Sequence, residues 1–328
     1  MEVPIIDIAP LVDKSQKSSQ VAAKIGQACR EYGFFYITGH RVDKSLQAKL
    51  VELSRKFFAL SLENKMKIKM LNGGIAWRGY FPCGEELTSG KPDVKEGIYF
   101  GEELDDENEL VRQKIPLHGK NLFPELLPEF SSVVLDYMSS ILQVGHVVLE
   151  GIAISLGLDK DYFYERYTRQ PLQLFRIFNY PATKLDKNSS MWGVGEHTDY
   201  GLLTILKQDN CGGLQVKLKT EWIDVPPIDD SFVCNIGDML DRMTGGLYRS
   251  TLHRVKCQTR ADRLSFPFFF DPNFFVQVKK IDGLEEQKDD RNQRWDLESV
   301  HEFQGTYGQY LLKKVSKVFP QLKDNVLI

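Results

Sequence analysis

The sequence predicts an α+β fold in which a β-sandwich or barrel follows a region of mixed helices and strands. Between Leu172 and Phe270 the chain is rich in aromatic and β-branched residues and is interrupted by frequent turn signals, as antiparallel sheets are. On both sides of this stretch apolar residues recur every three or four positions, which indicates amphipathic helices. No repeat, low-complexity tract or flexible linker divides the chain, so we expect residues 1–120 and 121–328 to pack closely.

The N-terminal region alternates short strands and helices. After the strand-like run at residues 3–6, residues 44–59 predict a helix that packs on the sheet, because an apolar stripe follows one face at Leu46, Leu50, Leu53 and Phe57. Ser61 is the expected N-cap of a second short helix that runs to Met70. An irregular loop then begins at Gly73, and the acidic residues 103–109 are expected to be solvated.

The second region begins with the longest predicted helix. From Pro128 to about Leu156 the apolar residues keep helical spacing over roughly eight turns, and we expect this helix to lie behind the barrel. The strands occupy about residues 170–275. The last helix, from about Glu298 to Val318, carries an apolar stripe and is expected to close one end of the barrel.

Length, charge and cysteine usage limit the class of protein. The chain has 328 residues, 42% of them hydrophobic, which is enough for a sizeable core. A net charge of −3, with basic residues dispersed among acidic ones, argues against electrostatic capture of nucleic acid or of an anionic membrane. No leader is apparent, and no apolar run approaches the roughly 20 residues of a membrane span. Five scattered cysteines without zinc spacing indicate reduced thiols, so we expect a cytoplasmic protein, with Cys29 and Cys234 in the core and Cys211 exposed.

Three residues predict a metal centre. His197 and Asp199 are two positions apart, so on an extended segment both side chains face the same side. His253 would arrive from a second strand, and two imidazoles with one carboxylate are the ligands of mononuclear Fe(II) sites that keep positions open for O2. A His-x-Asp pair alone is a weak signal in a chain with six histidines, because such pairs arise by chance.

The context strengthens this prediction. Arg263 and Ser265 are also two positions apart, so they share one face of the apolar strand that follows His253. An arginine in so apolar a run is costly unless it pairs with an anion. The other four histidines are expected to be structural or exposed; they are His40, His118, His146 and His301.

Several motifs in a fixed order point to a known family. The N-terminal half contains the runs at residues 3–7, 28–35 and 39–40; the C-terminal half contains the His-x-Asp pair, the runs at residues 212–216 and 235–238, His253-Arg254-Val255 and Arg263-x-Ser265. In this order the sequence resembles the Fe(II)/2-oxoglutarate-dependent dioxygenases of the isopenicillin N synthase-like superfamily over nearly the whole chain.

The resemblance implies both a fold and a reaction. It implies a double-stranded β-helix, or jelly-roll, core at about residues 170–275, preceded by an N-terminal dioxygenase region and supported by backing helices. Fe(II) would be held by His197, Asp199 and His253, with 2-oxoglutarate as co-substrate and O2 as oxidant. Decarboxylation of 2-oxoglutarate to succinate would be coupled to oxidation of a small molecule. Hydroxylation is the default outcome, and desaturation or ring closure are the alternatives.

The resemblance also assigns the co-substrate site. Arg263 and Ser265 would bind the distal carboxylate of 2-oxoglutarate, and Tyr180 matches the family tyrosine that contacts the co-substrate. Many plant members have an asparagine two residues before that tyrosine, whereas this chain has Phe178 there, so further co-substrate contacts from this strand are not implied.

Five residues are candidates for the substrate pocket. Arg78 could pair with a substrate carboxylate or anchor its own loop, and Glu96 could hold a cationic group or form an internal salt bridge. Trp192, Phe268 and Phe270 are candidate pocket walls, although large aromatic residues near a β-core are more often packing residues. Together Arg78 and Glu96 favour a small, polar, amino-acid-like substrate.

Other functions stay open at this point. An iron oxidase of the isopenicillin N synthase type would have the same metal ligands and would not need 2-oxoglutarate. A barrel that binds a small ligand without turnover would have no use for an open-faced iron site. Zinc also accepts two histidines and an aspartate, but a zinc hydrolase leaves Arg263 and Ser265 without a role. Nothing in the sequence indicates an oligomeric state.

Overall fold

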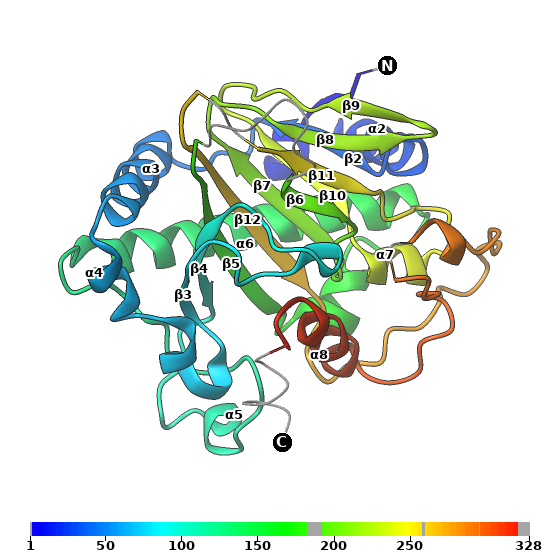
Figure 1. The fold of residues 1–328 in the computed structure, drawn as a ribbon. Coiled ribbons are helices and arrows are strands. Elements are labelled where there is room, and N and C mark those ends of the chain that lie inside the picture. Colours follow the sequence, from blue (N-terminus) through cyan, green and yellow to red (C-terminus); the bar gives the residue numbers. More distant parts are fainter. Residues whose placement is uncertain (1, 183–191, 258–259, 295, 321–328) are drawn as a thin grey trace.

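The computed structural model describes residues 2–182, 192–257, 260–294 and 296–320, and it contains two β-sheets with helices packed around them (Figure 1). The α+β prediction is confirmed, and the two facing sheets form the jelly-roll core that the family resemblance implied.

The larger sheet has eight strands in the order β1-β2-β10-β7-β12-β5-β4-β3. All neighbours in it are antiparallel except β1 and β2, which pair in parallel at the N-terminal edge. The N-terminal region therefore extends the barrel sheet at both edges, with β1 and β2 at one and β3 and β4 at the other. The bounds of its strands are β1 Ile5–Asp7, β2 Phe34–Thr38, β3 Gly79–Phe81, β4 Glu96–Gly101, β5 Leu172–Tyr180, β7 Leu203–Gln208, β10 Phe232–Ile236 and β12 Arg263–Asp271.

The smaller sheet has four antiparallel strands in the order β6-β11-β8-β9. Their bounds are β6 Trp192–His197, β8 Leu214–Leu218, β9 Glu221–Asp224 and β11 His253–Lys256. The register of β6 and β11 sets His197 directly opposite His253. In the larger sheet, the register of β5 and β12 sets Tyr180 opposite Arg263. Pairing thus brings together residues far apart in the sequence.

The helices lie around the sheets. Their bounds are α1 Ala9–Val12, α2 Ser18–Glu31, α3 Lys44–Phe58, α4 Leu62–Met66, α5 Glu109–Arg112, α6 Glu129–Ser155, α7 Asp238–Met243 and α8 Tyr307–Val318. The long helix α6 runs behind the larger sheet (Figure 1), as predicted, and packs against α2 and α3. The predicted helix at residues 44–59 is confirmed as α3. Among the described residues α6 is long and apolar enough to cross a membrane, contrary to the sequence expectation, but its buried residues belong to the core of this fold.

Two predicted helices are shorter than expected. Ser61 caps α4 as predicted, but the helix ends at Met66 rather than Met70. The helix predicted from Glu298 begins only at Tyr307, because Thr306 and Gln309 form a capping box that fixes its start. Just before this cap Gly305 adopts a φ of 133°, which no continuing helix allows.

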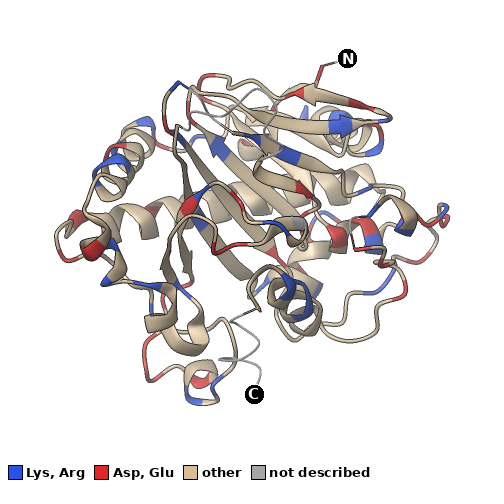
Figure 2. Ribbon diagram, in the orientation of Figure 1, with Lys and Arg blue, Asp and Glu red and all other residues tan. Residues whose placement is uncertain are grey.

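Charge and thiols follow the sequence expectations in the described part of the chain. Basic and acidic residues are interspersed on the ribbon in this view (Figure 2), in keeping with the net charge of −3. Cys29 and Cys234 are buried and Cys211 is exposed, as predicted.

Candidate metal centre and cavity

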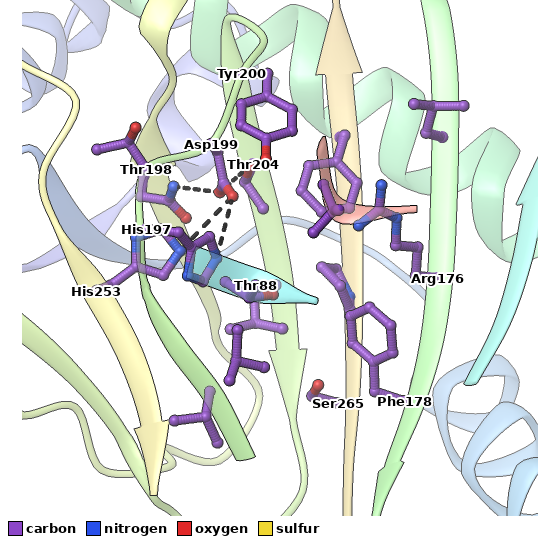
Figure 3. A pocket seen from close by; sticks show the side chains of 18 of the residues that line it. Thr88, Arg176, Phe178, His197, Thr198, Asp199, Tyr200, Thr204, His253 and Ser265 are labelled. Carbon is purple, nitrogen blue, oxygen red and sulfur yellow. Dashed lines mark hydrogen bonds and ion pairs between the residues drawn. The ribbon is translucent and has the colours of Figure 1, made fainter. Parts of the chain in front are cut away.

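The three predicted metal ligands meet in space. His197 is the last residue of β6, Asp199 follows it by two residues, and His253 is the first residue of the neighbouring strand β11. The Oδ1 atom of Asp199 lies 3.8 Å from Nε2 of His197 and 3.7 Å from Nε2 of His253. In Figure 3 both imidazoles point toward this carboxylate. Three donor atoms converge on one point from the smaller sheet and the loop after β6.

Each ligand is oriented by a second hydrogen bond. The Nδ1 atoms of His197 and His253 face the carbonyl oxygens of Gly195 at 2.9 Å and of Thr251 at 3.1 Å. If these Nδ1 atoms carry the proton, the Nε2 atoms keep their lone pairs for a metal. These backbone contacts fix which nitrogen faces the centre.

The carboxylate of Asp199 is held in the same way. Its Oδ2 atom accepts hydrogen bonds from Thr204 Oγ1 at 2.5 Å and Asn235 Nδ2 at 2.7 Å, which leaves Oδ1 for a metal. The sequence indicated no role for Asn235 beyond its place in a family motif, whereas it lies on β10 with its amide on Asp199. Because β10 and β7 are adjacent, both donors reach Asp199 from the larger sheet.

Protonation suits metal binding. Burial, followed by the nearby His253, lowers the pKa of His197 to about 3, so its imidazole is neutral at physiological pH. Burial alone would raise the pKa of Asp199, but the two histidines and the hydrogen bonds from Asn235 and Thr204 hold it below its ordinary value. Neutral imidazole and ionised carboxylate are the ligand forms that Fe(II) needs, so the residues present fit this metal.

Arg263 and Ser265 face the same cavity as the metal ligands. The Arg263 side chain is fully buried, and its Nη2 atom donates to Gln208 Oε1 at 3.2 Å. Its Nε and Nη1 atoms are buried without any hydrogen-bond partner among the described residues. The guanidinium carbon lies 4.8 Å from the centre of the Tyr180 ring. Arg263, Ser265 and Tyr180 therefore form one anion site between β5 and β12.

The cavity lies between the two sheets and encloses about 980 Å³, its open mouth included. Alternate residues of β12 line it, which are Arg263, Ser265, Pro267, Phe269 and Asp271. The predicted walls Phe268 and Phe270 point the other way and pack in the core, where Phe270 contacts His146. The strand period that aligned Arg263 with Ser265 excludes them from the cavity.

The other predicted substrate residues also lie outside the cavity. Arg78 is buried and donates to the carbonyl oxygens of Leu117 at 3.0 Å, Glu102 at 2.6 Å and Gly119, so it anchors its own loop.

Glu96 forms the internal salt bridge that the sequence left open, with Lys65 Nζ at 2.8 Å. It also accepts hydrogen bonds from Tyr80 at 2.6 Å and Asn179 at 2.9 Å. Trp192 packs against the guanidinium of Arg254, whose carbon lies 4.1 Å from the centre of the indole. All three candidates have partners within the fold.

Sequence reasoning missed the charged residues that do line the cavity, which are Glu86, Lys95, Arg176 and Asp271. Arg176 and Asp271 were predictable, because each lies an even number of residues from an identified cavity residue on its own strand, Tyr180 on β5 and Ser265 on β12. Glu86 lies in a loop outside any strand, so no local pattern indicates it. Lys95 immediately precedes β4.

Comparison with known proteins decides the family. The model of the 2OG-Fe(II) oxygenase superfamily matches residues 171–272, which contain the metal ligands and the anion site. The model described as the N-terminal part of the non-haem dioxygenases in morphine synthesis matches residues 3–126. The chain belongs to the 2-oxoglutarate–Fe(II) oxygenase superfamily. It is therefore an oxidoreductase that uses Fe(II), 2-oxoglutarate and O2 to oxidise a small molecule.

Named relatives span almost the whole oxygenase chain. A probable iron/ascorbate oxidoreductase of Dictyostelium discoideum is 52% identical, over 99% of this chain and 97% of its own length. A 1-aminocyclopropane-1-carboxylate oxidase of Dictyostelium mucoroides is 41% identical, over 97% and 95%. A homoarginine-6-hydroxylase of Oryza sativa is 36% identical, over 95% and 96%.

A solved structure agrees with the fold of the oxygenase. A full-length Neurospora crassa protein in complex with alpha-KG and thymine superposes with a TM-score of 0.79 at 27% identity, covering 96% of each chain.

Proposed function

We propose that this oxygenase holds Fe(II) with His197, Asp199 and His253, binds the distal carboxylate of 2-oxoglutarate with Arg263 and Ser265, and oxidises a small amino-acid-like molecule in the remaining part of the cavity. The observation that carries the proposal is that two buried nitrogens of Arg263, Nε and Nη1, have no hydrogen-bond partner among the described residues. Arg263 lines the same cavity as the three metal ligands.

An unpaired buried guanidinium is costly, and an ionised carboxylate removes that cost best, because it can accept two parallel hydrogen bonds. Tyr180 packs against the guanidinium and Gln208 accepts one hydrogen bond from Nη2, so the edge formed by Nη1 and Nη2 has little freedom to turn. A zinc hydrolase gives this arginine no ligand, and a barrel that binds a small ligand without turnover gives the open metal centre no role.

The residues around the metal prepare it for oxidation of a C–H bond, which is the chemistry that Fe(II), 2-oxoglutarate and O2 supply when bound. His197, Asp199 and His253 take one side of the metal and leave the side toward the cavity open. Phe178, Val194 and Phe269 give the cavity apolar walls that keep bulk water away. Arg263 fixes one end of the co-substrate so that its other end can face the metal.

The polarity of the cavity supports an amino-acid-like substrate. Arg176 and Asp271 lie on its wall in addition to the anion site, so a purely apolar substrate would cover these two charged groups without pairing with them. The names of two relatives refer to amino acids, 1-aminocyclopropane-1-carboxylate and homoarginine. These observations keep the substrate class expected from the sequence but assign it to different residues.

Release of labelled CO2 tests this function. Purified enzyme with Fe(II), O2 and 2-oxoglutarate labelled at C1 is incubated with pooled amino acids, and labelled CO2, succinate and oxidised product are counted. We expect equimolar CO2, succinate and product, and none from His253→Ala. Product without succinate would instead indicate an oxidase of the isopenicillin N synthase type. Iron binding without any turnover would indicate a barrel that only binds ligands.

A further inference from the structure

Arg176 is the second arginine that lines the cavity. Its guanidinium forms no hydrogen bond with the described part of the chain. It lies on the cavity face of β5, two residues before Phe178. Its Nε atom is buried and has no partner. The guanidinium carbon lies 4.0 Å from the centre of the Tyr99 ring and 4.7 Å from that of Phe269. The two rings hold the guanidinium in place without using its N–H groups.

The neighbouring acid does not satisfy Arg176. Its Nη1 atom lies 3.6 Å from Glu86 Oε1, which is too far for a hydrogen bond. That oxygen already accepts from Tyr99 OH at 2.8 Å, and the other oxygen of Glu86 lies 2.8 Å from Lys95 Nζ. Lys95 also pairs with Asp93 at 2.8 Å. Glu86 therefore belongs to a buried network with Tyr99, Lys95 and Asp93, and Arg176 lies at its edge, within ion-pair distance of Glu86 and lining the cavity.

Asp271 is the complementary acid. It is the last residue of β12 and lies on the same face of that strand as Ser265. Its Oδ2 atom accepts from Tyr307 OH at 2.5 Å, while no hydrogen bond to Oδ1 is present among the described residues. A Cβ atom added to Gly201 would lie 1.5 Å from Oδ1, so this oxygen lies against the loop that carries Asp199. Burial raises the pKa of Asp271 to about 7, while the hydrogen bond from Tyr307 and the charge of Arg176 lower it, so a bound cation would favour the ionised carboxylate.

Charge accounting separates these two residues from the rest of the cavity. Among the charged residues that line it, Asp199 belongs to the metal and Arg263 to 2-oxoglutarate, while Lys95 and Glu86 belong to the buried network. Arg176 and Asp271 remain as the two charged groups with unused hydrogen-bonding atoms: Arg176 forms no hydrogen bond and lies 3.6 Å from Glu86, and one oxygen of Asp271 accepts none from the described residues. A substrate that carries only an anion would give Asp271 no ligand, and one that carries only a cation would give Arg176 none.

We propose that Arg176 and Asp271 bind the two charges of a zwitterionic substrate, with the substrate carboxylate on Arg176 and its ammonium group on Asp271. This inference rests on the proposed function, since it needs 2-oxoglutarate at Arg263 and not at Arg176. It names the substrate class as free α-amino acids and excludes N-acylated or amidated ones.

Matched sets of compounds test it with the complete enzyme. Each common L-amino acid, L-homoarginine and 1-aminocyclopropane-1-carboxylate is assayed beside its carboxamide and its N-acetyl derivative, through labelled CO2 released from 2-oxoglutarate. We expect at least one free amino acid to stimulate release. Its two derivatives should lose roughly 30-fold or more in kcat/KM, because each leaves one buried charge without a partner.

Variants then assign each charge to one residue. Arg176→Met should raise the KM of the free amino acid by roughly 30-fold or more and abolish its preference over the carboxamide. Asp271→Asn should abolish the preference for the free amino acid over its N-acetyl derivative. It should leave the preference over the carboxamide intact. If either residue had only a structural role, its substitution would lower kcat/KM for all three compounds by the same factor. Arg176→Lys keeps the charge but loses the planar guanidinium, so its KM for the free amino acid should lie between those of wild type and Arg176→Met. The matched control is Arg169→Met, which removes an exposed arginine paired with Glu165.

The outcomes separate the two proposals. The visible band of the anaerobic Fe(II)–2-oxoglutarate complex should be unchanged in Arg176→Met. If the wild-type band is absent, the proposed function fails and this inference with it. If the band is present but no free amino acid stimulates turnover, or if derivatives act as well as free amino acids, the zwitterion inference alone is wrong. Weaker 2-oxoglutarate binding in Arg176→Met would also overturn it, because the anion of Arg176 would then be the co-substrate.

Discussion

Replacement of Arg263 by methionine is the most informative perturbation of the co-substrate site. The side chain is fully buried, with Nε and Nη1 free to bind an anion and Nη2 on Gln208. A carboxylate that accepts from two of these nitrogens gains two charge-assisted hydrogen bonds, each of about 1.5–3 kcal/mol. Their loss, at about 1.4 kcal/mol for each factor of ten, should raise the Kd of 2-oxoglutarate by roughly 100-fold to 10,000-fold.

The same substitution should not destabilise the ligand-free protein. Methionine keeps much of the apolar volume of arginine and removes a buried cation that pairs with no acid among the described residues, so the free energy of unfolding should stay equal or rise.

Two measurements check both expectations. Anaerobic titration of the Fe(II) protein with 2-oxoglutarate, followed by the visible charge-transfer band, gives the Kd, and urea unfolding of the metal-free protein gives the stability. Arg169→Met is the control with an exposed arginine. A Kd within about threefold of wild type would refute the assignment of Arg263. Unfolding at much lower urea would show that the arginine has a structural role instead.

Three further predictions concern residues that surround the metal ligands. Asn235→Leu removes the 2.7 Å hydrogen bond to Asp199 and should weaken Fe(II) binding by about 10- to 100-fold, as measured by competition with a chelator. An unchanged Fe(II) affinity in this variant would show that the contact does not orient the ligand. Gly201→Ala places a Cβ atom 1.5 Å from Asp271 Oδ1, so the loop or the carboxylate must move, and we expect a lower Tm and at least a tenfold loss of turnover; unchanged Tm and turnover would contradict the packing described here. Burial raises the pKa of Asp271 to about 7. The folded apoprotein therefore retains a proton that the unfolded chain loses above about pH 4, and the free energy of unfolding of wild type should fall as the pH rises from about 4 through 7. Asp271→Asn should therefore exceed wild type in unfolding free energy at pH 8 by up to about 4 kcal/mol, with the difference vanishing near pH 4; a difference independent of pH would contradict the burial effect.

Local patterns predicted the fold and the metal centre well. Period-3.6 stripes gave α3 and α6, and period-2 spacing placed His197 with Asp199 and Arg263 with Ser265. These features depend on residues a few positions apart, which the sequence displays directly. The start of α8 was wrong, because apolar spacing extends past the cap at Thr306 that determines where the helix begins.

The substrate pocket was predicted poorly, because its composition depends on contacts between distant segments. The Nη1 and Nη2 atoms of Arg78 donate to carbonyl groups some 24 to 41 residues away, and Glu96 accepts from Asn179 on another strand. No local pattern reveals such partners. The prediction of Phe268 and Phe270 as pocket walls failed for a different reason. The period of two that placed Arg263 and Ser265 on one face of β12 also places Pro267 and Phe269 there, so Phe268 and Phe270 lie on the opposite face.

An anaerobic crystal structure with Fe(II) and 2-oxoglutarate tests the central claim most directly. We predict iron on Nε2 of His197, Nε2 of His253 and Oδ1 of Asp199, and the distal carboxylate of 2-oxoglutarate on Arg263 and Ser265, with Arg176 and Asp271 left for the substrate. Iron at any other position, or the distal carboxylate on Arg176, would contradict the account.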